Sequence, residues 1–432
     1  MLMFSALLLL FAGVYFSFRT GFVQVRRFFR AMRVGGGAAG SGRGVSPFQA
    51  AATSLSATIG TGNIAGVAGA ILLGGPGAVF WMWVSAFFGM ALKAAEILIM
   101  LRFRGSGVGS PMRAIVRALP KRMHFLAGGV AFCGMLASVG MGDLVQVNAL
   151  AESVQTLAKA LDPAIAPARL RLVSLLTGVA VAAAIATASL GGAKRVGRIA
   201  ALLVPAMSLL YVVFSFIVIG MNLPRVPGAF ALILRAAFSP RAALGGAGGI
   251  TVAAVIRTGI VRGVFTHEAG LGTAALAHGE ADARDLSAQS LYGVFEVFFD
   301  TLLLCTLTAL AILVSGVPLD YGSAAENGAL VIRAFATVFG MRLSAVALSV
   351  SLFLFAFSSM LAFALYGTKC AVWLFGQRAY APFLIVFLTG TVLGSVMELS
   401  LAWRIAEFVN ALMALPNLAG MLLAARRMDL RI

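Results

Sequence analysis

The sequence is poor in charged residues. Only 11% of its 432 residues are Asp, Glu, Lys or Arg, whereas 61% are hydrophobic, and the mean hydropathy is +0.99. Soluble domains carry about 25% charged residues and about half apolar ones, so most of the surface of this chain must face lipid. The apolar runs are too long for barrel strands, and open sheet edges are excluded from the hydrocarbon core. The composition therefore predicts an all-α integral membrane protein.

The chain also lacks the motifs of enzymes and of ATP-driven pumps. It contains no P-loop, no HExxH pattern, no arrangement of His and acids typical of a triad, and no cofactor motif. Its three cysteines, Cys133, Cys305 and Cys370, lie in apolar surroundings without ligand-like spacing, so neither a disulfide framework nor a metal centre is expected. Residues 1–18 lead into Arg19 without a small-residue cleavage site, so we interpret this first apolar run as a retained span.

Acidic residues are scarcer than basic ones, 15 against 33, which gives a net charge of +18. The hydropathy pattern predicts eleven spans, at 1–18, 48–73, 78–101, 125–158, 170–190, 199–221, 246–275, 289–315, 343–368, 379–397 and 402–424. With these spans, 21 of the 33 Lys and Arg residues fall in loops on one side of the membrane. The positive-inside rule assigns that side to the cytoplasm, with the N-terminus outside and the C-terminus inside. The basic charge then indicates topology and contact with anionic lipids, not nucleic acid.

The spans after the first can be grouped as five plus five. This grouping divides the chain into an N-terminal span with a basic loop (1–47), two five-helix repeats (48–221 and 222–425) and a basic C-terminus (426–432). The two repeats start on opposite sides of the membrane, so they are inverted, and each begins with a glycine-rich span. Paired glycine-interrupted spans at corresponding positions are a sequence signal of the binding site of a secondary transporter.

The first of these glycine-rich spans contains the stretch SATIGTGNIAGVAGAILLGGPG, residues 56–77. Small residues at four-residue spacing, such as Gly62 and Gly66, also permit close helix packing, which is the alternative explanation. The polar residues at the same point favour a binding site, because unsatisfied polar groups cost several kcal/mol in the membrane core. If the helix unwinds between Gly60 and Asn63, free N–H groups suit a carboxylate and free carbonyls suit a cation or an ammonium group. The expected ligand is therefore a zwitterion.

Several stretches of this sequence resemble one transporter family. Beside SATIGTGNIAGVAGAILLGGPGAVFWMW they are GFVQVRRF, GDLVQVNALAE, LGGAKRVGRIA, RGVFTHEAGLGTAALAH, FDTLLLCTLTALAIL, FLFAFSSMLAFALYG and FVNALMALPNLAG. In this order they resemble the alanine or glycine:cation symporters, the sodium:alanine symporter family. The resemblance implies a leucine-transporter-like fold, with inverted five-helix repeats and one extra N-terminal helix. It also implies a plasma-membrane symporter, as in a bacterial inner membrane, that couples Na⁺ or alternatively H⁺ influx to uptake of a small neutral amino acid such as alanine, glycine or serine.

The same resemblance implies positions for the substrate and for the coupling cation. The substrate is expected at Gly60, Thr61, Gly62, Asn63, Gln146, Gly248, Gly249, Thr251 and Phe363. A cation is expected at Thr58, Thr61, Ser358 and Ser359, because hard cations take oxygen ligands. The alternative for Gln146 is an interhelical hydrogen bond, and the alternative for the serines is a bond to the preceding helical turn.

Three departures from the family pattern are candidates for specificity or ion coupling. Asp143 stands where the family has asparagine, and Phe363 stands where it has tryptophan. His267 stands where the family has asparagine, directly before Glu268, the first residue of the EAGLG stretch. The alternative for this histidine is a cap or gate contact. A buried carboxylate is by default a functional hypothesis, and a histidine can titrate near neutral pH.

Other charged residues inside the spans are predicted to be structural. Lys93 and Glu96 are three residues apart on one helix face and are expected to pair. A network between the seventh and eighth spans is expected from Arg257, Arg262, Glu296 and Asp300. A non-transporting amino-acid sensor on the same fold, or a channel-like protein, is the competing function.

Overall fold

The structure is a computed structural model that describes residues 2–34, 45–105, 110–239, 250–322 and 327–432. Within these ranges the chain is helical and contains no β-strand; one isolated bridge joins Val45 and Ala281. The predicted all-α class is confirmed.

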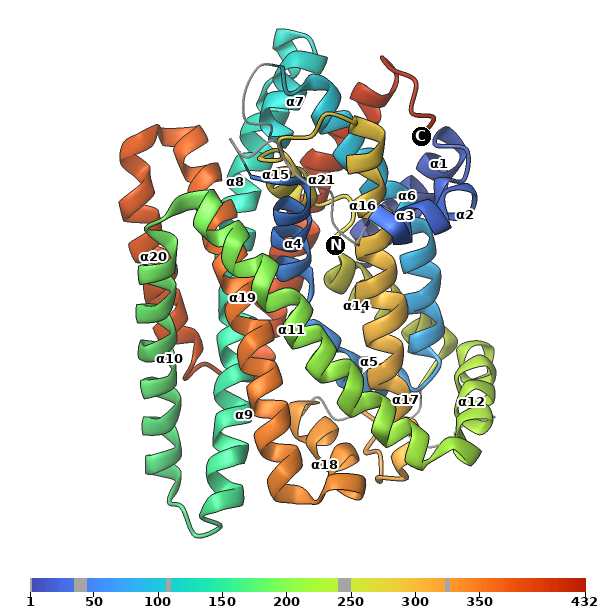
Figure 1. Cartoon of the computed structure of the whole chain (residues 1–432), viewed down its shortest axis with the longest axis vertical. Helices are drawn as coiled ribbons and strands as arrows, with labels where there is room; N and C mark the ends of the chain where they lie inside the picture. The colour runs from blue at the N-terminus through green and yellow to red at the C-terminus, as the bar shows by residue number, and fades with distance from the viewer. Residues whose placement is uncertain (1, 35–44, 106–109, 240–249, 323–326) are drawn as a thin grey trace.

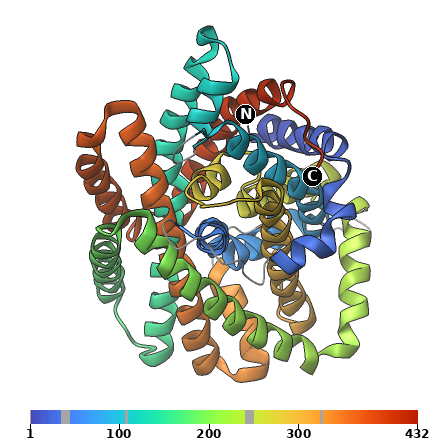
Figure 2. The same ribbon diagram turned by 45° about the horizontal axis from the view of Figure 1, so that its top comes forward.

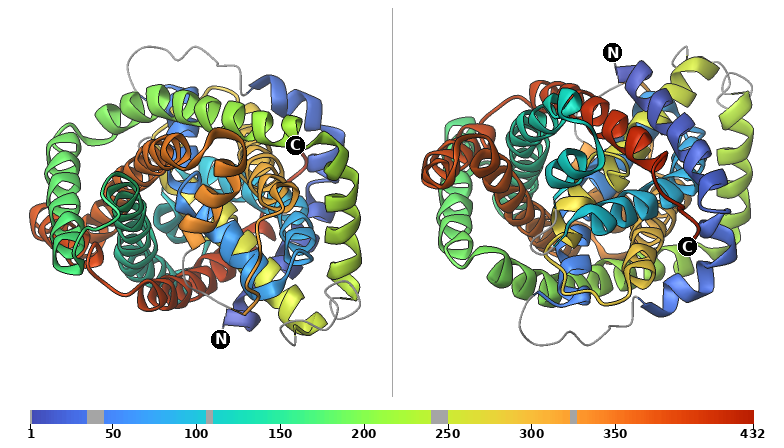
Figure 3. Two further views of the ribbon diagram at one scale, coloured as in Figure 1. Left: turned by 90° about the horizontal axis from the view of Figure 1, so that it is seen from below. Right: turned by 90° about the horizontal axis from the view of Figure 1, so that it is seen from above.

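Two discontinuous helices cross at the centre of the molecule. The first consists of α4 (Pro47–Thr58) and α5 (Ala65–Gly74), joined by the short 3₁₀ helix η1 (Thr61–Asn63). The second consists of α14 (Val252–His267) and α15 (Thr273–His278). They run antiparallel, so that α4 packs beside α15 and α5 beside α14 (Figure 1). Seen from above and below, the other helices surround this pair (Figure 3).

The surrounding helices correspond to the other predicted spans. They are α1 (Leu2–Arg19), α6 (Ala78–Phe103), α8 (Phe125–Val139) with η3 (Gly140–Leu144) and α9 (Val145–Leu161), α10 (Pro167–Ser189), α11 (Gly192–Met221), α16 (Leu286–Val297) with η6 (Phe298–Cys305) and α17 (Thr306–Ser315), α19 (Met341–Phe375), α20 (Tyr380–Gly394) and α21 (Leu399–Ala425). Shorter helices lie in the connections: α2 (Val23–Arg26), α3 (Phe28–Val34), α7 (Pro111–Ala118), η2 (Lys121–Met123), η4 (Leu223–Arg225), α12 (Val226–Phe238), α18 (Asn327–Phe339) and η7 (Gln377–Ala379).

Seven of the described helical segments are long and apolar enough to cross a membrane by themselves. The two discontinuous helices are not among them, because each is divided into two short pieces. The elements η3 and η6 are π-helical and interrupt otherwise continuous spans. Elements of this kind occur frequently at functional sites.

The burial of the helices separates an inner from an outer set. The most apolar window of α6 is 83% buried, whereas those of α10 and α11 are each 39% buried. The exposed side chains of α10 and α11 are large and apolar, including Leu172, Leu176, Leu202, Leu209 and Phe216. The strongly tilted α11 crosses one side of the molecule (Figure 2). These outer helices therefore present their apolar surface to lipid, and α6 belongs to the interior.

One end of the first discontinuous helix is fixed by local sequence and by its neighbour. Ser46 and Gln49 form a capping box, with Pro47 at the first helical position, which begins α4. Just before it, Val45 O accepts a hydrogen bond from Asp282 N at 2.9 Å. This contact ties the segment that precedes α4 to the segment that follows α15.

Candidate functional site

The first discontinuous helix unwinds at Gly60. The hydrogen bonds of α4 end with Ile59 N, which donates to Leu55 O, and Gly60 is then extended (φ −134°, ψ −158°). A Cβ at this position would lie 2.7 Å from Ser359 Oγ and 2.8 Å from Gln146 Oε1. Only glycine therefore lets both side chains approach the backbone. The predicted break is present, and a close approach explains its glycine.

Gln146 contacts the break from α9. Its Oε1 accepts hydrogen bonds from Thr61 N and from Thr61 Oγ1, each at 3.0 Å. Gln146 is buried and is the second residue after the π-helical segment η3. The backbone N–H of Thr61 thus donates to a neutral amide oxygen. A carboxylate would bind the same N–H more strongly, because its hydrogen bond is charge-assisted.

Ser359 contacts the other end of the break, from α19. Its Oγ donates at 2.9 Å to Ser56 O and to Ala57 O, two carbonyls in the last turn of α4. Carbonyls at the end of a helix lack partners within the helix. A hydroxyl with two carbonyls is a donor set of the kind that hard cations bind.

The other two hydroxyls of the predicted cation site make bonds within their own helices. Ser358 Oγ donates to Phe355 O at 3.0 Å, and Thr58 Oγ1 donates to Leu55 O at 3.3 Å. Such bonds to the preceding turn are the ordinary use of hydroxyls in helices. The structure therefore brings Ser359 to the carbonyls of the break, but not Ser358 or the Thr58 hydroxyl.

Asn63 connects the first break to the carboxylate of Asp300, a residue that was not predicted to belong to the site. Asn63 Oδ1 accepts from Gly60 N at 3.0 Å, and Asn63 Nδ2 donates to Asp300 Oδ1 at 2.6 Å. Asp300 lies on η6 and is fully buried. Among the described residues the network expected from Arg257, Arg262, Glu296 and Asp300 is not formed, since Arg262 pairs with Glu407 and Glu296 pairs with Lys93 and His278. The cost of a carboxylate inside a span was the signal that could have identified Asp300.

The second discontinuous helix breaks in the EAGLG stretch. Glu268, Gly270 and Gly272 have φ values of +54°, +85° and +96°, a region that glycine adopts readily and other residues rarely. The interruption of this span, 246–275, was predicted at its glycine-rich start. That placement was wrong, because these three residues unwind the chain between α14 and α15.

Of the three residues predicted to bind substrate from the start of this span, Thr251 is described by the structure, and it does not reach the second break. Gly248 and Gly249 lie outside the described residues. Thr251 caps the first turn of α14, where its Oγ1 accepts from Ala254 N at 3.2 Å, and it is exposed. It therefore lies at the end of α14 opposite to the break.

Glu96 of α6 lies at the backbone of the second break. Its Oε2 accepts from Gly270 N at 2.9 Å and its Oε1 accepts from Ala275 N at 3.1 Å. Both carboxylate oxygens are thus bound by backbone N–H groups, which are charge-assisted hydrogen bonds.

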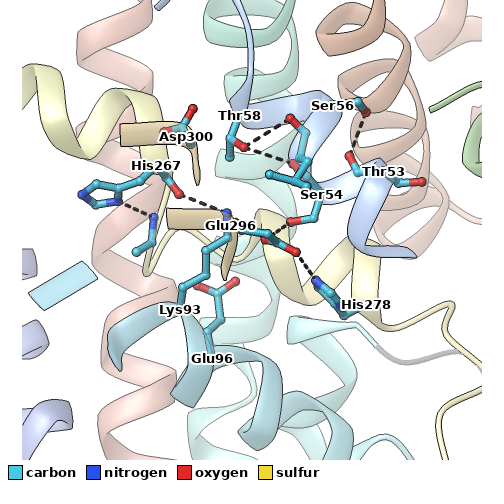
Figure 4. A network of polar contacts seen from close by, with 12 residues as sticks. Thr53, Ser54, Ser56, Thr58, Lys93, Glu96, His267, His278, Glu296 and Asp300 are labelled. Carbon is cyan, nitrogen blue, oxygen red and sulfur yellow. Dashed lines mark hydrogen bonds and ion pairs between the residues drawn. The ribbon is translucent and has the colours of Figure 1, made fainter. Parts of the chain in front are cut away.

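Lys93, one turn earlier on α6, lies at the opposite side of the same break. Its Nζ donates to His267 O at 3.1 Å and forms an ion pair with Glu296 at 3.1 Å (Figure 4). Glu296 also contacts His278 Nε2 at 2.7 Å and Ser54 Oγ at 2.6 Å. The predicted ion pair between Lys93 and Glu96 is wrong, because the helix face that carries both residues faces the broken helix.

His267 and Glu268 differ in how their polar atoms are satisfied. His267 Nδ1 accepts from Ala269 N at 3.1 Å, so the ring is a neutral tautomer whose Nε2 donates to Ser85 Oγ at 2.8 Å. This geometry favours the cap alternative for His267. Glu268 is buried, and its Oε2 has no hydrogen-bond partner among the described residues.

Asp143 and Phe363 lie close together, because Phe363 contacts the chain neighbour of Asp143. Asp143 Oδ1 accepts from Thr391 Oγ1 of α20 at 2.7 Å. Phe363 packs against Gly142, whose Cβ, if present, would lie 2.0 Å from the Phe363 ring. Asp143 therefore bonds to a neighbouring span, whereas Phe363 follows Ser359 by one helical turn.

An aromatic pair covers the break on the side of α5. A Cβ at Gly62 would lie 3.4 Å from the Phe265 ring, which is 4.9 Å from the Trp403 ring, centroid to centroid. The Arg262 guanidinium lies 3.9 Å from the centroid of Trp403 and 3.3 Å from a Glu407 carboxylate oxygen. These contacts join α14 to α21 across the break.

Comparisons with known proteins match nearly the whole chain to one family. The family model described as "Sodium:alanine symporter family" matches residues 1–428. The sodium/alanine symporter AgcS of Methanococcus maripaludis is 35% identical over 426 residues, which are 96% of this chain and 90% of that protein. The probable sodium/glutamine symporter GlnT of Bacillus subtilis is 33% identical over 435 residues, which are 97% of this chain and 85% of that protein.

Two solved structures have the same fold. MhsT in complex with L-phenylalanine matches with a TM-score of 0.62 and 15% identity, over 90% of this chain and 89% of that one. A Na⁺-coupled sialic acid symporter matches with a TM-score of 0.53 and 12% identity, over 99% of this chain and 97% of that one. At these identities the likeness concerns the fold alone. The predicted leucine-transporter-like fold is confirmed.

Proposed function

Because the chain belongs to the sodium:alanine symporter family, we propose that it couples Na⁺ influx to the uptake of a small neutral amino acid, such as alanine, glycine or serine. The members of this family are transporters, not enzymes, and Na⁺-coupled amino-acid symport is the activity that family and fold support.

The observation that carries this proposal is the difference between the two breaks. The second break is filled by the charged side chains of Lys93 and Glu96. The first break is held by neutral side chains, Gln146 at its N–H groups and Ser359 at its carbonyls. The carboxylate and ammonium of an amino acid form stronger, charge-assisted hydrogen bonds than these neutral groups do. A zwitterion can therefore replace the neutral contacts at the first break, from Gly60 to Asn63.

The surroundings of the first break favour a small side chain. Phe265 and Trp403 lie close to Gly62 and Gly66 on one side. Phe363 borders the site on the other side, one turn after Ser359. Large apolar rings on both sides leave little space for a substrate side chain.

The coupling Na⁺ is assigned to Ser359 Oγ with the carbonyls of Ser56 and Ala57. The hydroxyls of Thr58 and Ser358 complete this site when they turn from their own helices, and Thr61 adds its hydroxyl when the substrate replaces Gln146. Binding of Na⁺ here orders the end of α4 and so prepares the break for the amino acid, which is a shift in population towards the substrate-ready state.

Transport by alternating access requires the broken helices to move against the other spans. α6 packs against both halves of the second broken helix, α16 packs against α6, and the ion pair of Lys93 with Glu296 joins α6 to α16. We assign these elements to one moving unit. The repeat boundaries of 48–221 and 222–425, and an outside N-terminus with a cytoplasmic C-terminus, complete the proposed arrangement.

The test is uptake into proteoliposomes that contain the purified protein. Labelled alanine, glycine and serine are supplied with an inward Na⁺ gradient, with an inward proton gradient, or with neither. We expect uptake only with the Na⁺ gradient, and loss of that uptake in Ser359→Ala but not in Ser351→Ala, a buried serine of the same helix that bonds to its own backbone. Uptake that only the proton gradient drives would replace Na⁺ by H⁺. Amino-acid binding without any uptake would instead indicate a sensor.

A further inference from the structure

A polar cavity of about 250 Å³ lies between α9, α10 and the connection from α20 to α21. These three helices pack against one another at one edge of the molecule (Figure 1). None of the residues assigned above to the substrate or to the cation lines this cavity. Its volume is below the roughly 300–1,000 Å³ of pockets that enclose a drug-sized ligand. The cavity therefore suits a small polar group at a place separate from both breaks.

Two side chains of opposite charge line this cavity. Glu152 belongs to α9 and Arg171 to α10. No described residue forms a hydrogen bond or an ion pair with the Arg171 guanidinium. A guanidinium binds phosphate or carboxylate through two parallel N–H groups, and a carboxylate attracts an ammonium group. The cavity therefore matches a ligand that carries an anionic group and an ammonium group close together.

Neutral polar groups complete the lining and fix its walls. Asn148 Nδ2 of α9 donates to Gly394 O at 3.0 Å and to Met397 O at 2.6 Å, which holds the connection from α20 to α21 against α9. Ser174 of α10 is buried in the opposite wall. An apolar ligand would remove these polar groups from water without offering them hydrogen bonds, which is costly.

The rim of the cavity is apolar and exposed. Leu172 and Leu176 of α10 and Val396 of the connection are large apolar side chains on the outer surface. Arg171 is four residues from Pro167, the first residue of α10, and so lies about 6 Å along the helix from that end. The headgroup layer on each side of the hydrocarbon core is roughly 5–8 Å deep. Arg171 is thus at the depth of lipid phosphates, with acyl chains able to cover the leucines.

We propose that this cavity binds the headgroup of phosphatidylethanolamine, with the phosphate at Arg171 and the ammonium at Glu152. The quaternary ammonium of phosphatidylcholine has no N–H to donate to a carboxylate, and phosphatidylglycerol offers no cation to Glu152. The bound headgroup joins α9, α10 and the connection from α20 to α21, and so stabilises the side of the molecule where these elements meet lipid. This role does not depend on the proposed transport.

The first experiment counts the lipids that the purified full-length protein retains in native mass spectrometry. The protein is taken from micelles that contain equal amounts of phosphatidylethanolamine, phosphatidylcholine and phosphatidylglycerol. We expect one phosphatidylethanolamine per wild-type chain, and roughly ten-fold less retention in Arg171→Ala, the scale of one lost charge-assisted hydrogen bond. Arg169→Ala is the matched control, because Arg169 is exposed on the same helix and does not line the cavity; it should behave as the wild type does.

Glu152→Gln tests the ammonium end of the ligand. It keeps Arg171 but removes the negative charge, so the preference should change from phosphatidylethanolamine to phosphatidylglycerol. A reversed preference is not the result of a general loss of folding. Thermal unfolding in lipid nanodiscs is the second readout: phosphatidylethanolamine should raise the Tm above its value in phosphatidylcholine for the wild type and Arg169→Ala, but not for Arg171→Ala.

Three results would overturn the inference. The first is equal retention of the three lipids by the wild type. The second is equal retention of phosphatidylethanolamine by Arg171→Ala and Arg169→Ala. The third is a second equivalent of bound labelled alanine in the wild type that is absent in Arg171→Ala, because the cavity then takes a free amino acid and not a lipid headgroup.

Discussion

Glu96 Oε2 accepts a hydrogen bond from Gly270 N at 2.9 Å. The Glu96 carboxylate thus binds a backbone N–H group of the second break, as a substrate carboxylate is expected to bind one at the first break. Ser85 and Lys93 on the same face of α6 bind His267 at its ring and at its carbonyl. Their spacing of eight residues, with Glu96 three residues further, places all three side chains on one side of a helix. These three side chains therefore fix the second broken helix to α6.

Replacing this carboxylate by an amide should loosen the second break without changing the first. In Glu96→Gln only one side-chain oxygen remains to accept from Gly270 N and Ala275 N. We expect faster hydrogen–deuterium exchange confined to residues 268–275, with a lower maximal uptake rate and an unchanged KM for alanine. Glu398→Gln, at an exposed glutamate, is the control. A rise in exchange along the whole chain would show a general loss of stability instead.

Removing the amide of Gln146 should weaken substrate binding. In Gln146→Ala the bound substrate loses a neighbouring hydrogen-bonding side chain, at a cost of about 1–3 kcal/mol. The KM for alanine should rise roughly ten-fold or more, because 1.4 kcal/mol corresponds to a factor of ten. Gln155→Ala is the matched control, since Gln155 on the same helix bonds to Ser174. Equal KM values in the two variants would remove Gln146 from the binding site.

Asp143→Asn should leave substrate preference unchanged. The Thr391 hydroxyl that bonds Asp143 can bond the oxygen of an asparagine in the same way. The comparison is made by competition of glycine, serine and larger amino acids against labelled alanine. A changed order of preference would restore the specificity role that the sequence suggested for Asp143.

Phe363→Trp should reduce transport through crowding. The Phe363 ring already contacts Gly142 so closely that a Cβ there would overlap it. A larger ring requires movement of η3, and overpacking of this kind costs typically 1–3 kcal/mol. We expect a lower thermal unfolding temperature together with a selective loss of uptake of larger substrates over glycine. Full stability with unchanged selectivity would contradict the placement of Phe363 at the border of the site.

Cys305 provides a native reporter of access to the first break. Its Sγ lies 3.5 Å from Asn63 Nδ2 and is buried. In a background with Cys133→Ala and Cys370→Ala, we expect a methanethiosulfonate reagent to label Cys305 slowly, and Na⁺ with alanine to slow it further. Glu407→Gln removes the ion pair with Arg262 that joins α14 to α21, so labelling should become faster. An unchanged labelling rate in Glu407→Gln would show that this pair does not restrict access.

Sequence patterns predicted local features well and partners poorly. The break at Gly60 followed from glycines and polar residues within a few positions of each other, and Gln146 followed from a motif on the family pattern. The second break was misplaced because the glycine-rich start of its span was a stronger composition signal than the left-handed residues Glu268, Gly270 and Gly272. Lys93 was given the wrong partner because helix spacing compares residues of one helix, whereas Glu296 comes from another span. Asp300 was missed as a site residue for the same reason: its contact with Asn63 joins residues 237 positions apart.

The direction in which the central side chains point depends on the number of residues in the two π-helical segments, η3 and η6. Each contains a turn with more residues than an α-helix needs. Loss of a single residue from 140–144 would restore an α-helix and rotate Gln146 by roughly 100° relative to the preceding half of its span. Loss of one residue from 298–305 would likewise rotate one half of its span against the other. Descendants of such a chain could thus redirect these side chains by a one-residue insertion or deletion, without exchanging any residue that touches the ligand.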